Sequence, residues 1–245
     1  SSTFNSVNVS SASITGIMVN NITPTDTPLL EGDLFENDTA IDQIDILKIG
    51  SKELYVNDPA KGGQEFTVQG KHGVLTVFKD GTYEYQPSGL SGGLETFTYT
   101  TVSKAGTSQS ATLEINVSMT LTGSDEADTV QASASIDTFT LGEGADTVLY
   151  DVLNQAQHTE SPDIWTDFNQ AEGDRVDISA LLKDQNVTSS NIGEFVTIKQ
   201  DGANTVISVD TDGAKTKYNP TELIVLQNTD SSLYAIDDLL KYNQI

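Results

Sequence analysis

Residues 123–149 constrain the fold of this chain more than any other stretch, because their sequence repeats every nine residues. In register, the three units read GSDEADTVQ (123–131), ASASIDTFT (132–140) and LGEGADTVL (141–149). Each unit has Asp-Thr and then a large apolar residue at its sixth to eighth places. This period is typical of a parallel β-roll, in which a turn is followed by a short strand with one apolar side chain pointing inward. The repeat therefore predicts such a roll.

The turns of the predicted roll offer oxygen ligands to a cation. Asp128, Asp137 and Asp146 occupy the sixth place of the three units. Calcium is a hard ion that takes about six to eight oxygen ligands, so carboxylates and turn carbonyls suit it and soft ligands are not needed. We therefore expect Ca2+ to be bound by these turns.

Glycine is unevenly distributed over the three units. A full unit has glycines at its first, second and fourth places, whereas the third unit keeps Gly142 and Gly144, the first keeps Gly123 and the second has none. Other residues adopt φ > 0 only at a cost. We therefore expect one or two turns, above all the one with Gly142 and Gly144, to hold an ion in the usual way. The alternative interpretation is that these segments are ordinary hairpin turns of an antiparallel sheet.

The charge of the chain excludes some classes of function. The sequence has 36 acidic and 12 basic residues in 245, a formal net charge of −24. Nucleic acids and anionic membrane surfaces are bound by basic patches, so neither is an expected partner. Cysteine is absent, which excludes disulfides and thiolate metal sites. No run of 18 apolar residues occurs, so no membrane-spanning segment is expected.

Residues 26–118 read as a series of short strands. The segment 74–78, the turn 79–81 and the segment 82–86 form a strong hairpin signal, and residues 96–102 and 111–117 alternate polar and apolar residues. With no helical period between them, these strands predict an antiparallel sandwich. Residues 1–25 have scattered Val and Ile that could form one or two strands, and the segment is expected to be a linker or the tail of a preceding module.

The end of the chain returns to strands. Residues 194–198 and 205–209 flank a turn at Asp201-Gly202, and residues 221–226 form a strand that looks buried. The segment 231–240 has apolar residues at helical spacing behind a serine, which predicts a short helix.

The first module resembles the immunoglobulin-like extender repeats of very large bacterial adhesins. The resemblance is carried by LLEGD (29–33), ENDT (36–39), HGVLTVFKDGTYEY (72–85) and ETFTY (95–99), in this order. The acidic run that usually follows Asn-Asp-Thr is replaced by AIDQ (40–43), so we expect this module to fold without calcium.

The second module, residues 119–245, resembles the C-terminal region of RTX proteins, which are exported by type I secretion. The segments SPDIWTDF (161–168) and EGDRVDISALL (172–182) carry this resemblance. It implies calcium ligands at Asp163, Asp167, Asp174 and Asp177. The alternative is that Asp167 and Asp174 cap turns and that Ser179 caps a short helix. Trp165 and Phe168 are expected in the core.

Together these features predict an all-β chain: an immunoglobulin-like antiparallel sandwich, then a short calcium β-roll domain with a few short helices. The resemblances imply a non-catalytic, calcium-binding end of a secreted cell-surface adhesin that folds outside the cell and supports biofilm formation. Its expected partners are calcium ions and the type I secretion machinery. The alternatives are a calcium-dependent glycan- or surface-binding module and the non-catalytic tail of a secreted hydrolase. Catalysis by this chain itself is disfavoured, because neither His-Glu-x-x-His nor Gly-x-Ser-x-Gly occurs.

Overall fold

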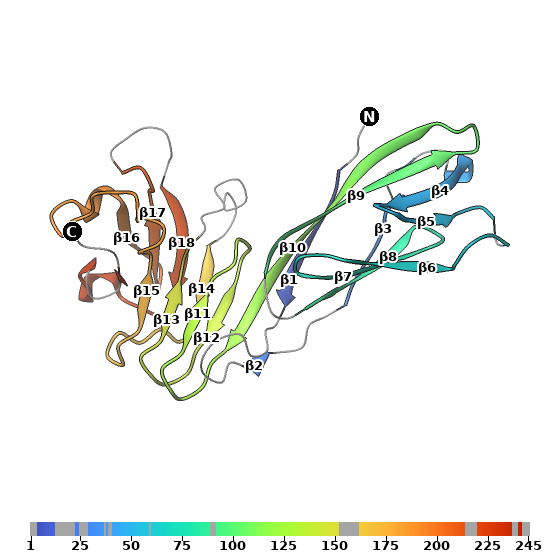
Figure 1. Cartoon of the computed structure of the whole chain (residues 1–245). Coiled ribbons are helices and arrows are strands. Elements are labelled where there is room, and N and C mark those ends of the chain that lie inside the picture. Colours follow the sequence, from blue (N-terminus) through green and yellow to red (C-terminus); the bar gives the residue numbers. More distant parts are fainter. Residues whose placement is uncertain are drawn as a thin grey trace.

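The computed structural model describes residues 4–12, 23–24, 29–36, 38, 41–58, 60–88, 92–151, 162–213, 220–236 and 240–241. Across these residues the chain is all-β, as the sequence predicts, with three short 3-10 helices at Ile41–Gln43 (η1), Ile192–Glu194 (η2) and Ser231–Leu233 (η3). The strands form two lobes, which a single long strand joins (Figure 1).

The strands of the first lobe are β1 (Phe4–Ala12), β3 (Leu30–Asp33), β4 (Ile44–Ile49), β5 (Lys52–Tyr55), β6 (Glu65–Gln69), β7 (Gly73–Phe78), β8 (Thr82–Pro87), β9 (Gly93–Ser103) and the first part of β10 (Ser108–Thr122). One layer is the antiparallel sheet β3-β8-β7-β6, and the other is β5-β4-β9-β10 with β1 alongside β10. The expected antiparallel sandwich is confirmed.

Alternation explains why these segments pack as two layers. Leu75 and Val77 of β7, and Leu113 and Ile115 of β10, are fully buried while their neighbours along the strand are partly exposed. Successive side chains of a strand point to opposite faces, so each strand gives one apolar row to the core. The predicted hairpin forms as β7 and β8, with Gly81 at φ +93° in its turn.

Strand β10 connects the lobes. Its residues Ser108–Val117 pair with β9. Its last three residues pair in parallel with β12. One of these three, Leu121, is also paired with Pro24 of the two-residue strand β2 (Thr23–Pro24). The core clusters change over along this strand: Val117 belongs to the core of the first lobe and Met119 to that of the second.

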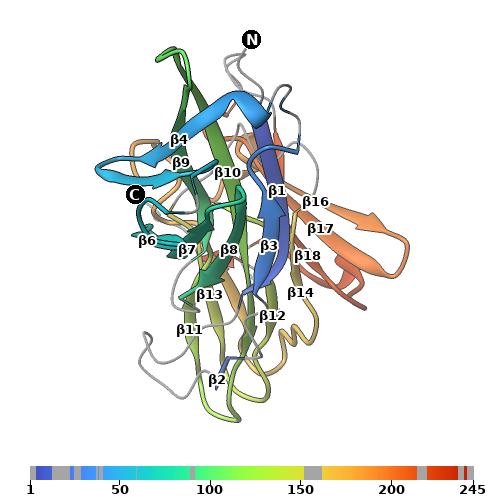
Figure 2. The same ribbon diagram turned by 90° about the vertical axis from the view of Figure 1, so that its right-hand side faces the viewer.

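The nine-residue repeat forms a parallel roll. Its strands are β11 (Thr129–Gln131), β12 (Thr138–Thr140), β13 (Thr147–Leu149), β14 (Asp163–Trp165) and β15 (Arg175–Asp177). Successive strands alternate between two sheets: β11, β13 and β15 pair in parallel with one another, and β12 pairs in parallel with β10 and β14. The two sets lie on opposite sides of the roll (Figure 2). Parallel pairing excludes the antiparallel-hairpin alternative for these strands.

The apolar residue of each unit fills the roll. Val130, Phe139 and Val148 are fully buried, and Trp165 continues the inner row of Phe139 one strand along the sheet. Trp165 packs edge-on against Phe168, with ring centroids 5.0 Å apart. Both aromatic residues therefore lie in the core, as expected.

The remaining strands extend the same two sheets. These are β16 (Val196–Asp201), β17 (Asn204–Val209), β18 (Thr221–Leu226) and β19 (Leu240–Lys241). The hairpin β16–β17 and the buried strand β18 form as predicted, and β18 pairs in parallel with β14.

Three segments differ from the expectations. Residues 4–12, expected in a linker or tail, form β1 in parallel with β10. The helix expected over 231–240 does not start at the serine: residues Ser231–Leu233 form η3, whose N-cap is Asp230, and Leu240–Lys241 form β19, which pairs with β15. Ile236 is helical, and residues 237–239 of this prediction lie outside the described residues. Residues 179–184 form turns instead of the short helix that Ser179 was considered to cap, and the Ser179 N–H donates to Asp177 Oδ1 at 2.9 Å.

Candidate metal centre

The roll brings five of the predicted aspartates into two stacked rows. The first ladder, as we call it, consists of the aspartates directly before β11, β13 and β15, which are Asp128, Asp146 and Asp174 respectively. Asp137 stands directly before β12, and Asp163 occupies the matching position in β14; we call these two the second ladder. All five side chains are at most 1% exposed. Residues 18 to 28 apart in the sequence thus become neighbours across the strands.

One hydrogen-bonding rule builds both ladders. Every ladder carboxylate except that of Asp128 accepts the main-chain N–H of the residue at the same position in the preceding strand of its sheet. Asp146 Oδ1 accepts from Asp128 N at 2.8 Å and Asp174 Oδ1 from Asp146 N at 2.9 Å. In the second ladder, Asp163 Oδ1 accepts from Asp137 N at 2.8 Å, and Asp137 Oδ1 accepts from Met119 N of β10 at 2.8 Å.

The second oxygens of the carboxylates differ between the two ladders. Ser133 donates its N–H to Asp137 Oδ2 at 2.6 Å and its hydroxyl to Asp137 Oδ1 at 2.9 Å. The Tyr150 hydroxyl donates to Asp163 Oδ2 at 2.6 Å. Every carboxylate oxygen of the second ladder therefore has a donor.

Two oxygens of the first ladder have none. Asp128 Oδ1 and Asp146 Oδ2 are buried and lack a hydrogen-bond partner among the residues that the structure describes. Ser124 donates both its N–H and its hydroxyl to Asp128 Oδ2. Its Oδ1 is left over because β11 is the first strand of its sheet, so no preceding strand supplies an N–H.

Asp146 lacks a partner for a different reason. The residue four places before it, which is serine in the first two units, is Gly142 in the third. Glycine has no hydroxyl, and the Gly142 N–H donates to Asp167 Oδ2 at 2.8 Å instead. The glycine that a tight turn requires therefore leaves Asp146 Oδ2 unpaired.

Burial raises the pKa of these carboxyl groups. The pKa of Asp146 is raised to about 7 by burial, and the carboxylates of Asp174, Asp128 and Asp167 add to the shift. Burial raises the pKa of Asp174 to about 6 and that of Asp137 to about 7. Charged carboxylates in low-dielectric surroundings are unfavourable unless a cation or donors compensate them.

In the second ladder, burial and the neighbouring Asp137 carboxyl raise the pKa of Asp163 well above its usual value. None of the five ladder carboxylates forms an ion pair with a described Lys or Arg. The charge of the first ladder is therefore uncompensated by the protein's own cations over the residues that the structure describes.

The glycines of the repeat allow successive turns to stack closely. Gly142 has φ +92° and Gly144 has φ +132°. A Cβ at Gly142 would overlap the carbonyl oxygen of Ser124, and one at Gly144 would lie 2.8 Å from the carbonyl oxygen of Glu126. These two carbonyl groups of the first turn thus lie against the third turn.

The residues present fit a calcium ion only with main-chain ligands. Within the described residues, no group of three or more His, Cys, Asp or Glu side chains is arranged to hold a metal ion. The first ladder does supply two buried carboxylate oxygens without donors, from Asp128 and Asp146. Calcium takes carboxylate and carbonyl oxygens together. Asp128, Asp146 and the carbonyls of Ser124 and Glu126 are therefore the candidate ligands.

Asp167 and Asp177 lie outside the ladders and cap turns. Asp167 Oδ1 accepts from Leu141 N at 3.1 Å and from the indole N–H of Trp165 at 3.0 Å, and its Oδ2 accepts from Gly142. Asp174 also caps a turn, through Asn169 N at 2.8 Å. The capping interpretation thus describes the hydrogen bonds of Asp167 and Asp174, and Asp177, which it did not include, accepts the N–H of Ser179 in the same way.

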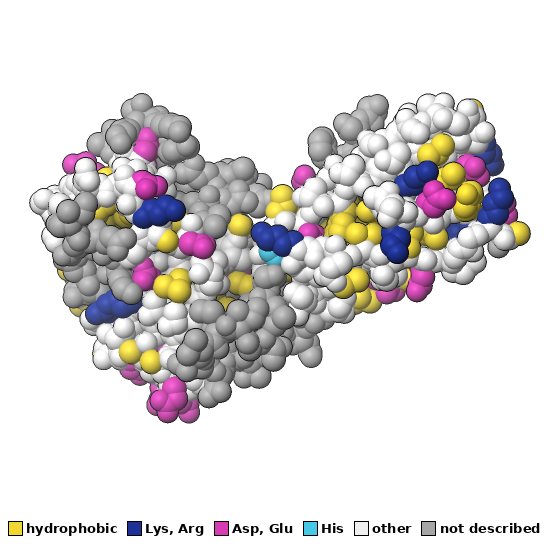
Figure 3. All heavy atoms as spheres, viewed as in Figure 1, with side chains coloured by type: hydrophobic (Ala, Val, Ile, Leu, Met, Phe, Trp, Pro, Cys, Tyr) yellow, Lys and Arg dark blue, Asp and Glu magenta, His cyan; other side chains and the backbone are white. Residues whose placement is uncertain are grey.

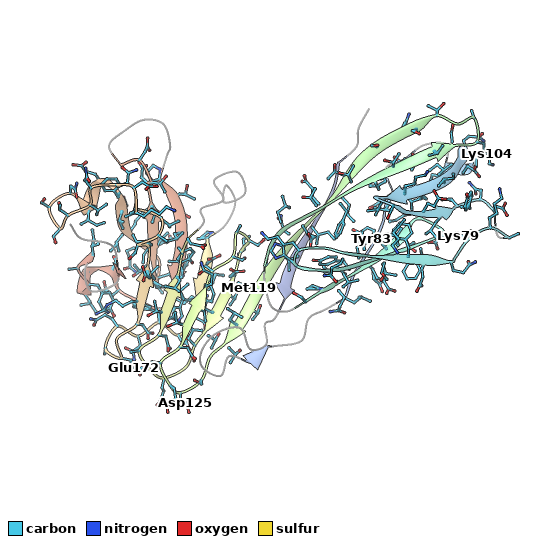
Figure 4. The ribbon with its side chains drawn as sticks, in the orientation of Figure 1. Lys79, Tyr83, Lys104, Met119, Asp125 and Glu172 are labelled. Atoms are coloured by element: carbon cyan, nitrogen blue, oxygen red, sulfur yellow. The ribbon has the colours of Figure 1, made fainter. Side chains whose placement is uncertain are left out.

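Some residues of the site were missed from the sequence. Ser124 and Ser133 share the spacing Ser-x-x-x-Asp, which was a usable signal, whereas nothing in the sequence linked Tyr150 to Asp163. A further group consists of exposed acidic residues at the turn tips: Asp125, Glu126, Glu143 and Glu172. Asp125 and Glu172 lie at the same end of the roll (Figure 4), and acidic side chains gather there on the surface (Figure 3).

A comparison with protein families agrees with the sandwich fold of the first lobe. The bacterial Ig domain family (Big_9) matches residues 12–116, so the chain contains a bacterial Ig-like domain. No curated protein matches the chain.

Among solved structures, the chain is similar to the AlgE6R3 subunit of the mannuronan C5-epimerase from Azotobacter vinelandii. The identity is 18% over 51% of this chain and 78% of that one, with a TM-score of 0.34, which is too weak a likeness to bear on function. No helix in the described part of the chain is long and apolar enough to cross a membrane.

Proposed function

We propose that this chain is a non-catalytic, calcium-stabilised part of a bacterial surface protein, in which the Ig-like domain acts as a spacer and the β-roll folds fully only when calcium is bound. The observation that carries this proposal is the pair of buried carboxylate oxygens without donors, Asp128 Oδ1 and Asp146 Oδ2, in two stacked turns. A buried charge without a partner opposes folding, and a cation bound there removes that cost.

Electrostatics beyond the two turns supports the same proposal. The net charge of −24 and the exposed acidic residues at the turn tips raise the local concentration of cations. Magnesium is smaller and gives up its water reluctantly, so a site rich in main-chain carbonyls favours calcium.

The size of the effect can be estimated from binding linkage. Extracellular calcium modules have dissociation constants of about 0.1 to 1 mM. At roughly ten times that concentration, each site adds RT ln(11), or about 1.4 kcal/mol, to the free energy of unfolding. One or two sites thus contribute a sizeable fraction of the stability of a small domain.

The setting of this function follows from the two resemblances. Ig-like domains of bacteria are compatible with an extracellular or surface location. We propose that the chain is exported by type I secretion while calcium is scarce, folds outside the cell and supports adhesion and biofilm formation. A glycan-binding role has less support, because Trp165, the one tryptophan of the sequence, is fully buried and cannot line a sugar site.

The test is thermal unfolding of the whole chain in calcium, in magnesium and after removal of divalent cations with a chelating resin. We expect calcium to raise the unfolding temperature of the second lobe by about 4 to 8 °C for each site, and magnesium to raise it less. Equal unfolding temperatures in all three conditions would remove calcium from the proposal. A calcium-dependent hydrolysis of ester, peptide or glycoside that is lost in the Asp146→Asn variant would remove the non-catalytic assignment.

A further inference from the structure

The two ladders offer a cation different surroundings. The second ladder has four carboxylate oxygens, and all four accept hydrogen bonds from Met119, Ser133, Asp137 or Tyr150. The first ladder leaves Asp128 Oδ1 and Asp146 Oδ2 without donors although both side chains are fully buried.

We infer that calcium is held by the first ladder alone, and that the second ladder is closed by its own hydrogen bonds and takes no cation. This inference rests on the proposed function. It assigns different roles to aspartates that occupy equivalent positions in the sequence repeat and that the resemblance to RTX proteins treats alike.

The cost of metal binding differs between the ladders. A cation at Asp137 would displace donors and leave the main-chain N–H groups of Met119 and Ser133 without acceptors inside the protein. Buried N–H groups without acceptors are unfavourable. A cation at Asp128 and Asp146 displaces nothing, because the two free oxygens are already desolvated and unpaired.

Three local features close the second ladder. Strand β10 precedes β12 in its sheet and supplies the Met119 N–H to Asp137. No strand precedes β11 in the other sheet, so Asp128 receives no such N–H. Ser133 replaces the turn glycine and supplies both an N–H and a hydroxyl. Tyr150, which directly follows β13 of the opposite sheet, supplies its hydroxyl to Asp163.

The second ladder has a role that needs no metal. Asp137 accepts the N–H of Met119, which lies in β10, and β10 also belongs to the Ig-like domain. The side of the roll that continues the sheet of the first lobe is therefore fastened by hydrogen bonds, while the other side depends on the cation.

Two isosteric variants separate the ladders. In Asp146→Asn, the amide oxygen still accepts from Asp128 N while the amide nitrogen replaces the oxygen that has no donor. In Asp163→Asn, the amide oxygen still accepts from Asp137 N, and the amide nitrogen donates to Tyr150, whose hydroxyl accepts as well as donates. Each variant replaces a carboxyl group with a neutral amide and keeps the main-chain hydrogen bond of its ladder, while the Tyr150 hydrogen bond reverses its direction in Asp163→Asn.

The experiment measures the number of calcium ions bound to the whole chain by native mass spectrometry and their affinity by calorimetry. We expect Asp146→Asn to lose an ion or to weaken calcium binding at least about tenfold. Asp163→Asn should keep the ion count and affinity of the unsubstituted chain within error. Circular dichroism in calcium confirms that each variant is folded. If Asp163→Asn does not fold, Ser133→Ala replaces it as the second-ladder variant, because Asp137 then still accepts the main-chain N–H groups of Met119 and of residue 133.

The outcomes distinguish this inference from the proposal beneath it. If Asp163→Asn or Ser133→Ala loses an ion or weakens binding as Asp146→Asn does, the asymmetry is wrong and the calcium function stands. If only the second-ladder variants weaken binding, the assignment is reversed and the inference fails. An unsubstituted chain that binds no calcium overturns both.

Discussion

The main-chain N–H of Asp128 donates to Oδ1 of Asp146 at 2.8 Å, so these two aspartates stand one strand apart in the roll. Each then keeps one buried oxygen, Oδ1 of Asp128 and Oδ2 of Asp146, that no donor reaches. The hydrogen bond that orders the ladder thus also concentrates negative charge inside it. Both the stability of the metal-free chain and its response to calcium should depend on this relationship.

Asp146→Asn should change stability in opposite directions with and without calcium. After metal removal at pH 8, the variant should be more stable than the unsubstituted chain by about 1 to 3 kcal/mol, because a buried carboxylate is replaced by a neutral amide. In calcium it should be less stable, because a ligand is lost. Denaturant unfolding in both conditions measures the change. The control is Glu143→Gln, an exposed residue of the same turn, for which we expect a change within about 0.5 kcal/mol. A variant that is destabilised in both conditions would show that Asp146 is compensated by something other than a cation.

The metal-free chain should lose stability as the pH rises from about 4 to about 7. The pKa values of Asp137 and Asp146 are raised from 3.8 to about 7, and that of Asp174 to about 6. In this window the folded state holds more protons than the unfolded state, so the free energy of unfolding falls with pH and levels off above it. Thermal midpoints of metal-free protein across this range measure the slope, and added calcium should flatten it. A midpoint that rises over the same range would contradict these shifts.

Gly142→Ala should destabilise the roll by about 2 to 4 kcal/mol. The substitution imposes φ +92° on a residue with a Cβ, and that Cβ would overlap the carbonyl oxygen of Ser124. Two controls separate these effects: Gly202→Ala has φ +59° but no atom within 4 Å, and Gly193→Ala has open space at an ordinary φ. We expect about 1 kcal/mol for Gly202→Ala and less for Gly193→Ala. If Gly142→Ala costs no more than Gly202→Ala, the two turns are not stacked as described.

Glu95→Ala should destabilise the Ig-like domain by an amount that calcium does not change. The buried Glu95 carboxylate accepts N–H groups of Lys71 and His72 at 3.0 and 2.7 Å and the hydroxyl of Tyr85 at 3.0 Å. Removing it leaves these donors without this acceptor, at a cost of about 2 to 4 kcal/mol. As a control, Glu53→Ala removes a surface pair with Lys48 and an exposed hydrogen bond from the Tyr55 hydroxyl, and should cost at most about 1 kcal/mol.

The same comparison tests whether the Ig-like domain needs calcium. We expect the unfolding transition of this domain to keep its midpoint after metal removal, in the unsubstituted chain as in Glu95→Ala. A loss of many degrees on metal removal would reveal a cation site in the first lobe.

Strands and their faces were predictable because they depend on local periodicity. The period of nine predicted parallel strands with Val130, Phe139 and Val148 inside, and β18 forms over the predicted residues Thr221–Leu226. The alternation in β7 and β10 predicted the sandwich. Each of these signals lies within a window of a few residues.

The differences between the ladders depend on long-range contacts and were not predictable. Asp128 and Asp137 look alike in the repeat, yet only Asp137 has a preceding strand, β10, to supply an N–H. The Tyr150–Asp163 hydrogen bond crosses from one sheet to the other, and Asp146 meets Asp174 only because the chain closes a turn 28 residues later. The start of the C-terminal helix was predicted wrongly, because Leu233, one of the apolar residues at helical spacing, is 70% exposed in η3.

The most direct test of a calcium-dependent roll is a crystal structure of the whole chain grown in calcium, with ions located by anomalous scattering. We predict an ion within coordination distance, about 2.3 to 2.6 Å, of Asp128 Oδ1 or Asp146 Oδ2, with carbonyl oxygens of the Ser124–Glu126 turn completing its shell. The carboxylates of Asp137 and Asp163 should keep their hydrogen bonds to Met119 and Tyr150. A map with no ion on the first ladder, and with Asp128 and Asp146 still buried and unpaired, would contradict the account.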